Sequence, residues 1–417
     1  MDLRPKSYEK ICQLLHKGVD IPNPMTIDIG DEINIDRISG KDVRIYPGCR
    51  IYGRDTVISS GSRLGYEAPV TIESCRIGAG VELRGGYFSH SVFLEQSRMG
   101  MGAHVREGSI LEEQVYAAHD VGLKQTILFP FVTIGSLINF CDCLMAGGTS
   151  RQNHSEVGSS FIHFNYTPDG DKATPSLIGD VPRGVMLNKS PIFLGGQGGI
   201  VGPLRLGYGN VVAAGSILRD DHPEDNNLIF PAAPSGGVRE FMLAAYPNIR
   251  RIVENNICYI ANLKALETWY TEVRKSFFEP LEFGPFIYAG VMEQLFLAIK
   301  ERLKRLRDMA ERPIAPAPHG PASESARDRR ILNERFGEIE NLFTGTVRDD
   351  LMERSHDAFI RAFQKITEHD RSYIETIQNL PADVASKGSR WLDSMVGTLC
   401  EHASRAMPSL SLFRKWQ

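Results

Sequence analysis

The feature that most constrains this chain is a six-residue repeat of aliphatic residues in its first half. Aliphatic side chains recur at Ile45, Ile51 and Val57, at Met99, Val105 and Leu111, at Val121 and Ile127, and at Leu206, Val212 and Leu218. Neither the 3.6-residue period of a helix nor the two-residue alternation of a hairpin fits this spacing. Small residues and glycines follow many of the aliphatics, as in LGYGNV-VAAGSI, where tight turns require them.

Such a repeat predicts a solenoid in which each group of six residues is one short strand and a turn. Three groups make one triangular coil of about 18 residues, and each aliphatic side chain points inward onto its equivalent in the next coil. We therefore predict a left-handed parallel β-helix over residues 25–222, with strands of four to six residues. A parallel solenoid of the other hand is the alternative, but strict spacing by six favours the left-handed form.

The chain divides into three regions and one interruption. Residues 1–24 read as a short amphipathic helix and a lead-in to the solenoid. Glycine then marks a boundary, because 32 of the 39 glycines precede residue 251, and apolar spacings of three and four follow. We predict a helical domain over residues 223–417 with a mobile Pro-rich linker at 312–325. Polar residues replace the repeat over 147–176, which predicts an insertion loop, either functional or simply solvated.

Composition excludes several classes of partner. The net charge of −4 and the absence of a single-sign tail argue against nucleic-acid binding, and the run KERLKRLR is interpreted as a solvated helix face. No apolar run reaches the roughly 18 residues of a membrane span, and the N-terminus has no signal-peptide hydrophobic region. Seven cysteines without a paired framework suit a reducing cytoplasm. Cys141 and Cys143 are interpreted as strand residues, so no metal is expected.

Two segments carry a resemblance to a known family. HFNYTPDGDKATPSLIGD and FLGGQGGIVGPLRLGYGNVVAAGSIL resemble the acetyltransferase half of bacterial bifunctional N-acetylglucosamine-1-phosphate uridyltransferases. The chain also resembles stand-alone proteins described as UDP-N-acetylglucosamine pyrophosphorylase-like. The resemblance implies an acyltransferase that uses acetyl-CoA or another acyl-CoA and acts on an amino sugar or sugar nucleotide. It also implies a homotrimer with sites between neighbouring solenoids.

The sequence departs from the family pattern at important places. It contains no Gly-rich nucleotide loop followed by Lys, and the first 24 residues are too few for a nucleotide-binding domain, so uridyl transfer is not expected. The family's catalytic histidine, about 20 residues before the Asn-Tyr pair, is not clearly present, and Asn139 falls near that place. Gly196 stands where the family has a serine.

Two histidines are candidates for the base that acyl transfer to an amine requires. His154 and His163 flank the insertion, and a neutral imidazole suits proton transfer near neutral pH. His154 lies among polar residues, so that Glu156 or a neighbour could orient it. For each histidine the alternative is an exposed or structurally hydrogen-bonded side chain.

The binding candidates follow from the resemblance. Asn165 and Tyr166 match the family's substrate or acetyl contacts, although turn chemistry before Pro168 also explains them. Lys172, with help from Arg151, would bind an anionic group such as a sugar phosphate. The expected coenzyme contacts are Gly196, Ala213 and Ala214. Small residues required by a tight coil are the alternative for these three.

A second class of function stays open at this point. Loss of the histidine and the serine favours a non-catalytic sugar-nucleotide-binding or assembly protein that kept the scaffold. The retained Asn165, Tyr166 and Lys172 favour the acyltransferase. A zinc-dependent carbonic anhydrase of solenoid type is not expected, because His90, His104 and His119 are spaced by 14 and 15 residues rather than by a coil of about 18.

Overall fold

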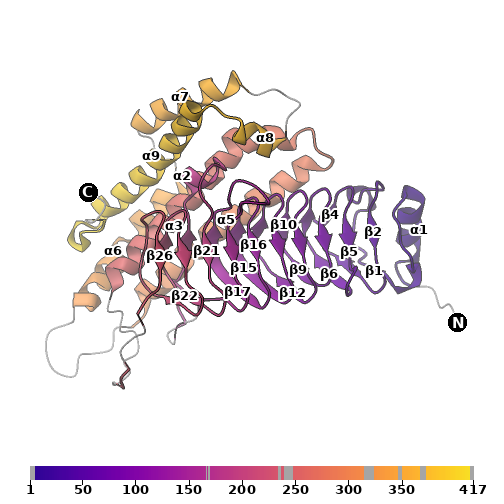
Figure 1. Ribbon diagram of the computed structural model, residues 1–417, viewed down its shortest axis with the longest axis horizontal. Helices are drawn as coiled ribbons and strands as arrows, with labels where there is room; N and C mark the ends of the chain where they lie inside the picture. Colours follow the sequence, from indigo (N-terminus) through magenta and orange to yellow (C-terminus); the bar gives the residue numbers. More distant parts are fainter. Residues whose placement is uncertain are drawn as a thin grey trace.

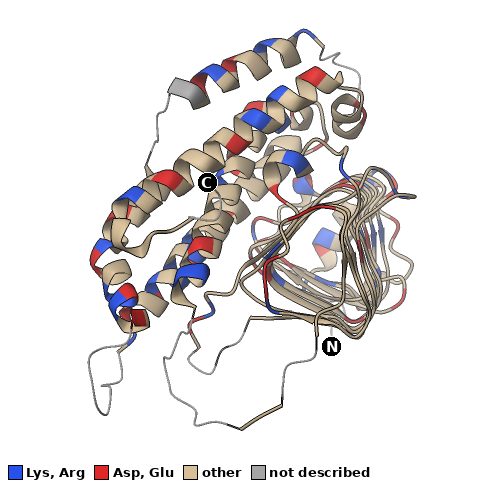
Figure 2. Cartoon of the chain, turned by 60° about the vertical axis from the view of Figure 1, so that its left-hand side comes forward, with Lys and Arg blue, Asp and Glu red and all other residues tan. Residues whose placement is uncertain are grey.

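A triangular parallel β-solenoid forms the first half of the molecule, and a bundle of helices lies along it (Figure 1; Figure 2). The computed structural model describes residues 5–165, 167, 170–232, 236–238, 248–313, 324–345, 350–366 and 372–413. Tyr166 lies outside these residues. The parallel β-helix predicted from the six-residue repeat, followed by a helical region, is confirmed.

The solenoid has three faces, numbered here in the order in which each coil visits them. The first face carries β1 (Asp28–Ile29), β3 (Arg50–Tyr52), β6 (Val70–Glu73), β9 (Gly86–Ser89), β12 (Ala103–Val105), the first halves of β15 (Val121–Leu128) and β17 (Ile138–Met145), β19 (Ile162–Phe164), β22 (Gly199–Val201) and β25 (Ile217–Leu218). The second face carries β4 (Val57–Ile58), β7 (Arg76–Ile77), β10 (Ser91–Phe93), β13 (Ser109–Leu111), the second halves of β15 and β17, β20 (Ser176–Ile178) and β23 (Arg205–Leu206). The third face is a 10-stranded sheet of β2 (Arg44–Ile45), β5 (Arg63–Leu64), β8 (Glu82–Leu83), β11 (Arg98–Met99), β14 (Tyr116–Ala117), β16 (Thr133–Ile134), β18 (Glu156–Val157), β21 (Phe193–Leu194), β24 (Val211–Val212) and β26 (Leu228–Ile229).

Aliphatic and aromatic side chains stack in columns inside the solenoid. Ile51 pairs with Ile72, Ile72 with Phe88, and Phe88 with Val105, and all four are fully buried. The strands are shorter than the predicted four to six residues: most have two to four, and only β15 and β17 have eight. The chain turns at a corner after each side, so at most four residues per side pair with the next coil.

The segment 147–176 is not the single loop that its polar composition predicts. Glu156–Val157 form β18 on the third face and Ile162–Phe164 form β19 on the first, so the solenoid continues through this segment. Two shorter stretches remain outside the strands, at 147–155 and at the described residues 165, 167 and 170–175. A further excursion, not recognised in the sequence, contains the short helix α2 (Val181–Gly184), whose first turn is capped by Asp180.

The first coil is covered by the predicted N-terminal helix, α1 (Tyr8–Lys17). Ile11 and Leu14 of α1 are buried, and Lys10 Nζ donates to the carbonyls of Gly30, Asp31 and Ile33 at 2.7 to 2.9 Å. An uncovered first coil would expose apolar side chains and unpaired backbone groups, as an edge strand does. The helix therefore supplies the cap that a solenoid needs.

The helical region lies against the second face of the solenoid (Figure 1; Figure 2). It consists of α3 (Ile249–Trp269), a π-helical turn (Tyr270–Arg274), α4 (Lys275–Phe278), α5 (Gly284–Glu311), α6 (Glu324–Thr344), α7 (Asp350–Gln364), α8 (Tyr373–Gln378) and α9 (Ala382–Ala406). Helix α5 packs on β7, β10 and β13, and α3 packs on β20. Most of the predicted Pro-rich linker, residues 314–323, lies outside the described residues. None of the described helices is long and apolar enough to cross a membrane.

A buried ionic cluster joins the helices to the corner between the second and third faces. Arg274, in the π-helical turn, lies between Glu112 and Glu113, with its Nη1 3.1 Å from Glu112 Oε1 and its guanidinium 3.8 Å from the ring centre of Tyr373. Tyr270 donates a hydrogen bond to Glu112. Burial raises the pKa of Glu112 to about 7; the charge of Arg274 opposes this shift and the charge of Glu113 adds to it. One guanidinium cannot balance two buried carboxylates, so the folded protein holds a proton here that the unfolded chain loses.

This cluster predicts a particular dependence of stability on pH. The folded pKa of Glu112 lies above the ordinary carboxyl value, so the free energy of unfolding falls as pH rises from about 4.5 to about 7. Glu112→Gln cannot ionise and should lose this component. Denaturant unfolding at pH 5 and pH 8 measures the difference, with the exposed Glu9→Gln as control. Equal pH dependence in wild type and Glu112→Gln would contradict the assignment.

Candidate functional site

Three cationic side chains lie close enough to Cys141, at the corner between the first and second faces, for their charges to act on its thiol. Arg106 follows β12, Lys124 ends the first half of β15, and Cys141 pairs with Lys124 on the next coil. Arg106 N bonds to the carbonyl of Leu123, so Arg106 and Lys124 are neighbours on the outer surface. The positive charges of Arg106, Lys124 and Lys172 all act on the Cys141 thiol. We call these three cations the cationic cluster.

The environment of the cationic cluster limits its chemistry. Burial, with the charge of Asp142 adding, raises the pKa of Cys141 to about 11, although the three cations oppose the shift. The thiol is therefore neutral near pH 7 and is no nucleophile. Lys124 also pairs with Glu107 at 2.6 Å. Partial burial works to raise the pKa of Glu107, but the bond to Lys124, a backbone hydrogen bond and the charges of Lys124 and Arg106 together lower it.

Neutral polar groups border the cationic cluster. Asn139 lies on the same strand as Cys141, is exposed, and accepts a hydrogen bond from its thiol at 3.5 Å. Asn165 donates to Asp142 Oδ2 at 3.3 Å. The structure thus brings together three of the residues predicted from the sequence, Asn139, Asn165 and Lys172.

A glycine without a side chain, Gly122, lies on the outer surface beside Lys124. Gly122 occupies the outward position between His104 and Asn139 in the parallel register. A methyl group on Gly122 would be in ordinary van der Waals contact with Asn139, whose Oδ1 would be its nearest neighbour at 3.6 Å. Gly122 therefore leaves the backbone next to the cationic cluster without a side chain of its own.

His154 and Arg151 lie at a different corner, between the second and third faces. Arg151 donates to the carbonyls of Gln114 and Phe131 and to Thr133 Oγ1, so its guanidinium braces three coils. His154 Nδ1 lies 2.7 Å from the Arg151 carbonyl, and its Nε2 lies 3.5 Å from Glu156 Oε2. The Arg151 carbonyl therefore fixes the imidazole through Nδ1, and Glu156 lies beside the other ring nitrogen. Within one chain, however, the helix-covered second face separates His154 from the cationic cluster.

His163 points into the solenoid rather than toward solvent. It pairs with Ile200, is 2% exposed, and its Nε2 lies 2.8 Å from Ser176 Oγ. Burial lowers its pKa to about 3. A side chain in this position cannot reach a substrate, so the expectation that His163 acts as a base is not supported. Its neighbours Ile162 and Phe164 are the exposed members of the strand.

The three predicted coenzyme contacts lie at the corner between the third and first faces. A Cβ on Gly195 would lie 2.4 Å from Ala214 N, and one on Gly158 would lie 2.4 Å from Gly196 N. Close stacking of coils therefore accounts for the glycines at this corner. Ala214 is exposed and Gly196 and Ala213 are half-buried, so the outer surface here is lined by small residues.

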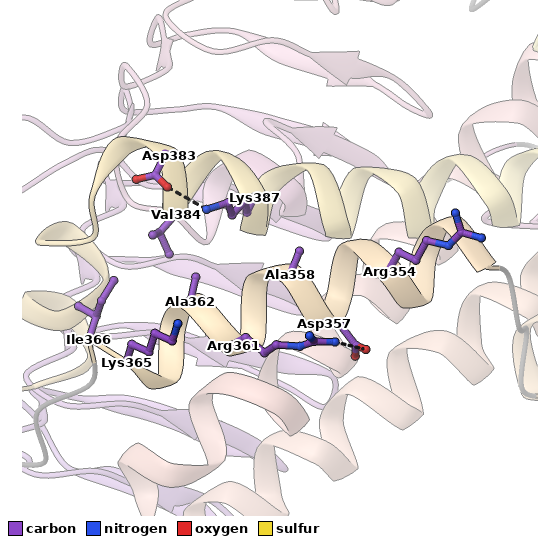
Figure 3. Close-up of a pocket in the computed structure, with 10 residues that line it drawn as sticks. All are labelled: Arg354, Asp357, Ala358, Arg361, Ala362, Lys365, Ile366, Asp383, Val384 and Lys387. Carbon is purple, nitrogen blue, oxygen red and sulfur yellow. Dashed lines mark hydrogen bonds and ion pairs between the residues drawn. The ribbon is translucent and has the colours of Figure 1, made fainter.

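A groove of about 620 Å³ lies elsewhere, between α7 and α9 (Figure 3). Ala358, Ala362 and Val384 point into the space between the two helices (Figure 3). Two of its charged pairs, Arg361–Asp357 and Lys387–Asp383, are ion pairs at 3.2 and 2.8 Å. Among the described residues, no group of three His, Cys, Asp or Glu side chains is arranged to hold a metal ion.

Comparison with known proteins finds distant relatives over about half of the chain. Over 215 residues the chain is 30% identical to the bifunctional protein GlmU of Thermotoga maritima, covering 51% of this chain and 42% of that protein. It is 28% identical over 214 residues to GlmU of Shouchella clausii, covering 50% and 40%. The chain thus spans about two fifths of the length of these relatives. No protein-family model matches.

Two solved structures are also similar to the chain at low scores. The UDP-N-acetylglucosamine acyltransferase from Campylobacter jejuni is 12% identical, with a TM-score of 0.17 over 50% of this chain and 68% of that one. The polySia-specific acetyltransferase NeuO is 10% identical, with a TM-score of 0.14 over 53% and 87%. At these TM-scores the two likenesses support no functional conclusion.

The first half of this chain is a parallel β-solenoid built from hexapeptide repeats. Over about half of its length, the chain is a distant homologue of the bifunctional GlmU proteins.

Arg106 and Lys124 are the site residues that sequence reasoning missed. They are separated by 18 residues, one coil of the solenoid, and so occupy equivalent outward positions. Spacing by 18 residues relates Arg106 to Lys124 in the sequence. Only the strand register, however, shows that both side chains point outward. The resemblance alone pointed to Lys172.

The buried position of His163 makes a testable prediction. Its folded pKa lies below the ordinary value of 6.5, so the stability that depends on its neutral form is lost as pH falls below about 6.5. His163→Ile, which copies its partner Ile200, should show a weaker loss of unfolding free energy between pH 7.5 and pH 5.5. Denaturant unfolding at both pH values tests this, with the exposed His16→Gln as control. An unchanged pH dependence in His163→Ile would disprove it.

Proposed function

We propose that this protein transfers an acyl group from acyl-CoA, with acetyl-CoA as the simplest donor, to the amine of a phosphorylated amino sugar or sugar nucleotide. The observation that carries the proposal is the convergence of Arg106, Lys124 and Lys172 on the outer surface of a solenoid homologous to GlmU. Charge-assisted bonds from such groups suit phosphate oxygens. Asn139 and Asn165 lie beside them and can bond sugar hydroxyls.

In the proposed reaction a base takes a proton from the acceptor amine as the nitrogen attacks the thioester carbonyl. The tetrahedral oxyanion then collapses, the carbon–sulfur bond breaks, and the thiolate of coenzyme A takes the proton from the base. His154, held by the Arg151 carbonyl through Nδ1, is the proposed base. Because it lies at another corner of its own chain, we propose that a neighbouring copy supplies it to the cationic cluster.

Exposed apolar residues support a contact between copies. Ile162, Phe164, Val201 and Ile217 are 37 to 40% exposed on the first face, and Phe193, Val211 and Leu228 are 40 to 63% exposed on the third. These two patches flank the corner of small residues that carries Gly196, Ala213 and Ala214. We propose a homotrimer that buries this edge, with the coenzyme along the corner and the loops of residues 147–176 reaching the neighbour.

A non-catalytic sugar-nucleotide-binding protein is the second candidate. Two observations favour it. The guanidinium of Arg151 is engaged by two carbonyls and Thr133, and His154 is remote from the cationic cluster within a chain. The two candidates share the phosphate site and differ only in turnover.

Lys172→Ala tests the phosphate site. Loss of one charge-assisted contact, about 1.5–3 kcal/mol, should weaken binding of glucosamine 1-phosphate or a UDP-sugar about ten-fold or more. Calorimetric titration measures this, and the effect should shrink at high salt. The exposed Lys304→Ala on α5 is the matched control and should bind as wild type does. Unchanged affinity in Lys172→Ala for every sugar phosphate and acyl-CoA tested would refute the site.

His154→Ala distinguishes the acyltransferase from the non-catalytic binding protein. An acyltransferase should lose turnover in this variant and keep its affinity for the sugar phosphate, because the histidine acts on the amine alone. Release of free coenzyme A thiol from acetyl-CoA in the presence of the amino sugar measures turnover. Absence of turnover in the wild type, with binding intact, would support the binding protein.

The assembly is tested on the third-face patch. Val211→Glu should convert a trimer into monomers, because it places a charge within a buried apolar contact. Light scattering at micromolar concentration measures the mass, and Phe296→Glu, at an exposed apolar position of α5, is the control. A monomeric wild type would count against both the trimer and the shared site.

A further inference from the structure

We propose that Arg302 of α5 is a positioning residue that holds Lys172 in the geometry required for anion binding. This inference rests on the phosphate site proposed above, and it assigns a role to the helical region in that site. Arg302 lies at the bottom of the interface between α5 and the solenoid, 2% exposed. It cannot touch a ligand on the outer surface, so any influence on binding must pass through the groups that it holds.

The first of these groups is Asp142. It follows Cys141 directly, sits at the corner in the middle of β17 with φ 61°, and is 3% exposed. Arg302 Nη2 lies 2.6 Å from its Oδ1, while its Oδ2 accepts the hydrogen bond from Asn165. Asp142 thus connects Arg302 to the start of the loop that carries Lys172.

The second group is the backbone of that loop. Arg302 Nη1 donates to the Lys172 carbonyl at 3.4 Å, and Asn256 of α3 donates to the next carbonyl, that of Ala173, at 3.0 Å. Side chains of α5 and α3 therefore bond two successive carbonyls, those of Lys172 and Ala173. Both bonds run from the helical region to the loop, so the loop conformation depends on the docked helices.

The backbone conformation of Lys172 explains why these two hydrogen bonds are needed. Its φ is 57°, in the left-handed region that a lysine adopts only at a cost in energy. Without the bonds from Arg302 and Asn256, the loop would relax toward ordinary φ values and carry the ammonium away from Arg106 and Lys124. Repulsion among the three cations acts in the same direction.

A double-mutant cycle on the full-length protein tests the inference. Binding of glucosamine 1-phosphate is titrated for wild type, Lys172→Ala, Arg302→Gln and the double variant. If Arg302 acts through Lys172, Arg302→Gln weakens binding up to the roughly ten-fold loss of Lys172→Ala. The double variant then binds no more weakly than Lys172→Ala. The salt dependence of binding falls equally in both single variants, which a general loss of stability would not produce.

The control is a second buried arginine at the same interface. Arg274→Gln also removes a guanidinium that is at most 2% exposed and pairs with carboxylates of the solenoid, but it lies at the other corner of the second face. It should lower the melting temperature and leave the affinity unchanged. If Arg302→Gln does not fold, Asn256→Ala takes its place in the cycle, because it removes the bond to the Ala173 carbonyl, together with one bond to the Ile252 carbonyl within α3.

The outcomes separate the two proposals. A folded Arg302→Gln, or Asn256→Ala in its place, with wild-type affinity overturns the positioning role, and so does a loss that adds in full to that of Lys172→Ala. If instead Lys172→Ala itself binds normally, the phosphate site is wrong, and the positioning role falls with it. If Arg302→Gln binds the sugar phosphate more weakly and the double variant loses no further affinity, both proposals are supported.

Discussion

Each coil of the solenoid depends on the next for its backbone hydrogen bonds and for the burial of its inward side chain. Ile51, Ile72, Phe88 and Val105 stack in one column because the parallel register places each over the last. The same constraint turns His163 inward, where it takes the place held by Ile200 on the following coil. It also leaves one end of the solenoid in need of a cover, which α1 supplies. Function is then confined to outward positions and to the corners.

The helical region attaches to the second face through buried polar contacts as well as apolar ones. Arg274 and Arg302 are at most 2% exposed, and each pairs with carboxylates of the solenoid. Buried ion pairs contribute little net stability, because desolvation offsets their attraction, but removing one partner leaves a costly buried charge. They therefore specify where the helices dock. Arg302 connects this docking to the proposed site, since its partners Asp142 and the Lys172 carbonyl belong to that site.

The proposed site consists of positive charges that repel one another and are held close together by the fold. Arg106 and Lys124 are neighbours because their strands are hydrogen-bonded, and Lys172 joins them from a separate loop. Lys124 keeps Glu107 as a partner, so the charge of the cluster is only partly balanced. A bound phosphate would relieve the repulsion among the remaining charges, and that relief contributes to its affinity.

The sequence by itself determined the solenoid, because spacing by six is a local property of the chain that survives without any knowledge of contacts. It also determined Asn165 and Lys172 as candidates, through short motifs. It could not determine which residues of the segment 147–176 point inward. A shift of one residue along the strand would move His163 from the core to the solvent. The tertiary structure alone decided that Arg106 and Lys124 join Lys172, that His154 lies at another corner, and that Arg302 reaches the site from 130 residues away. Contacts between distant parts of the chain depend on register and docking, and no local pattern encodes them.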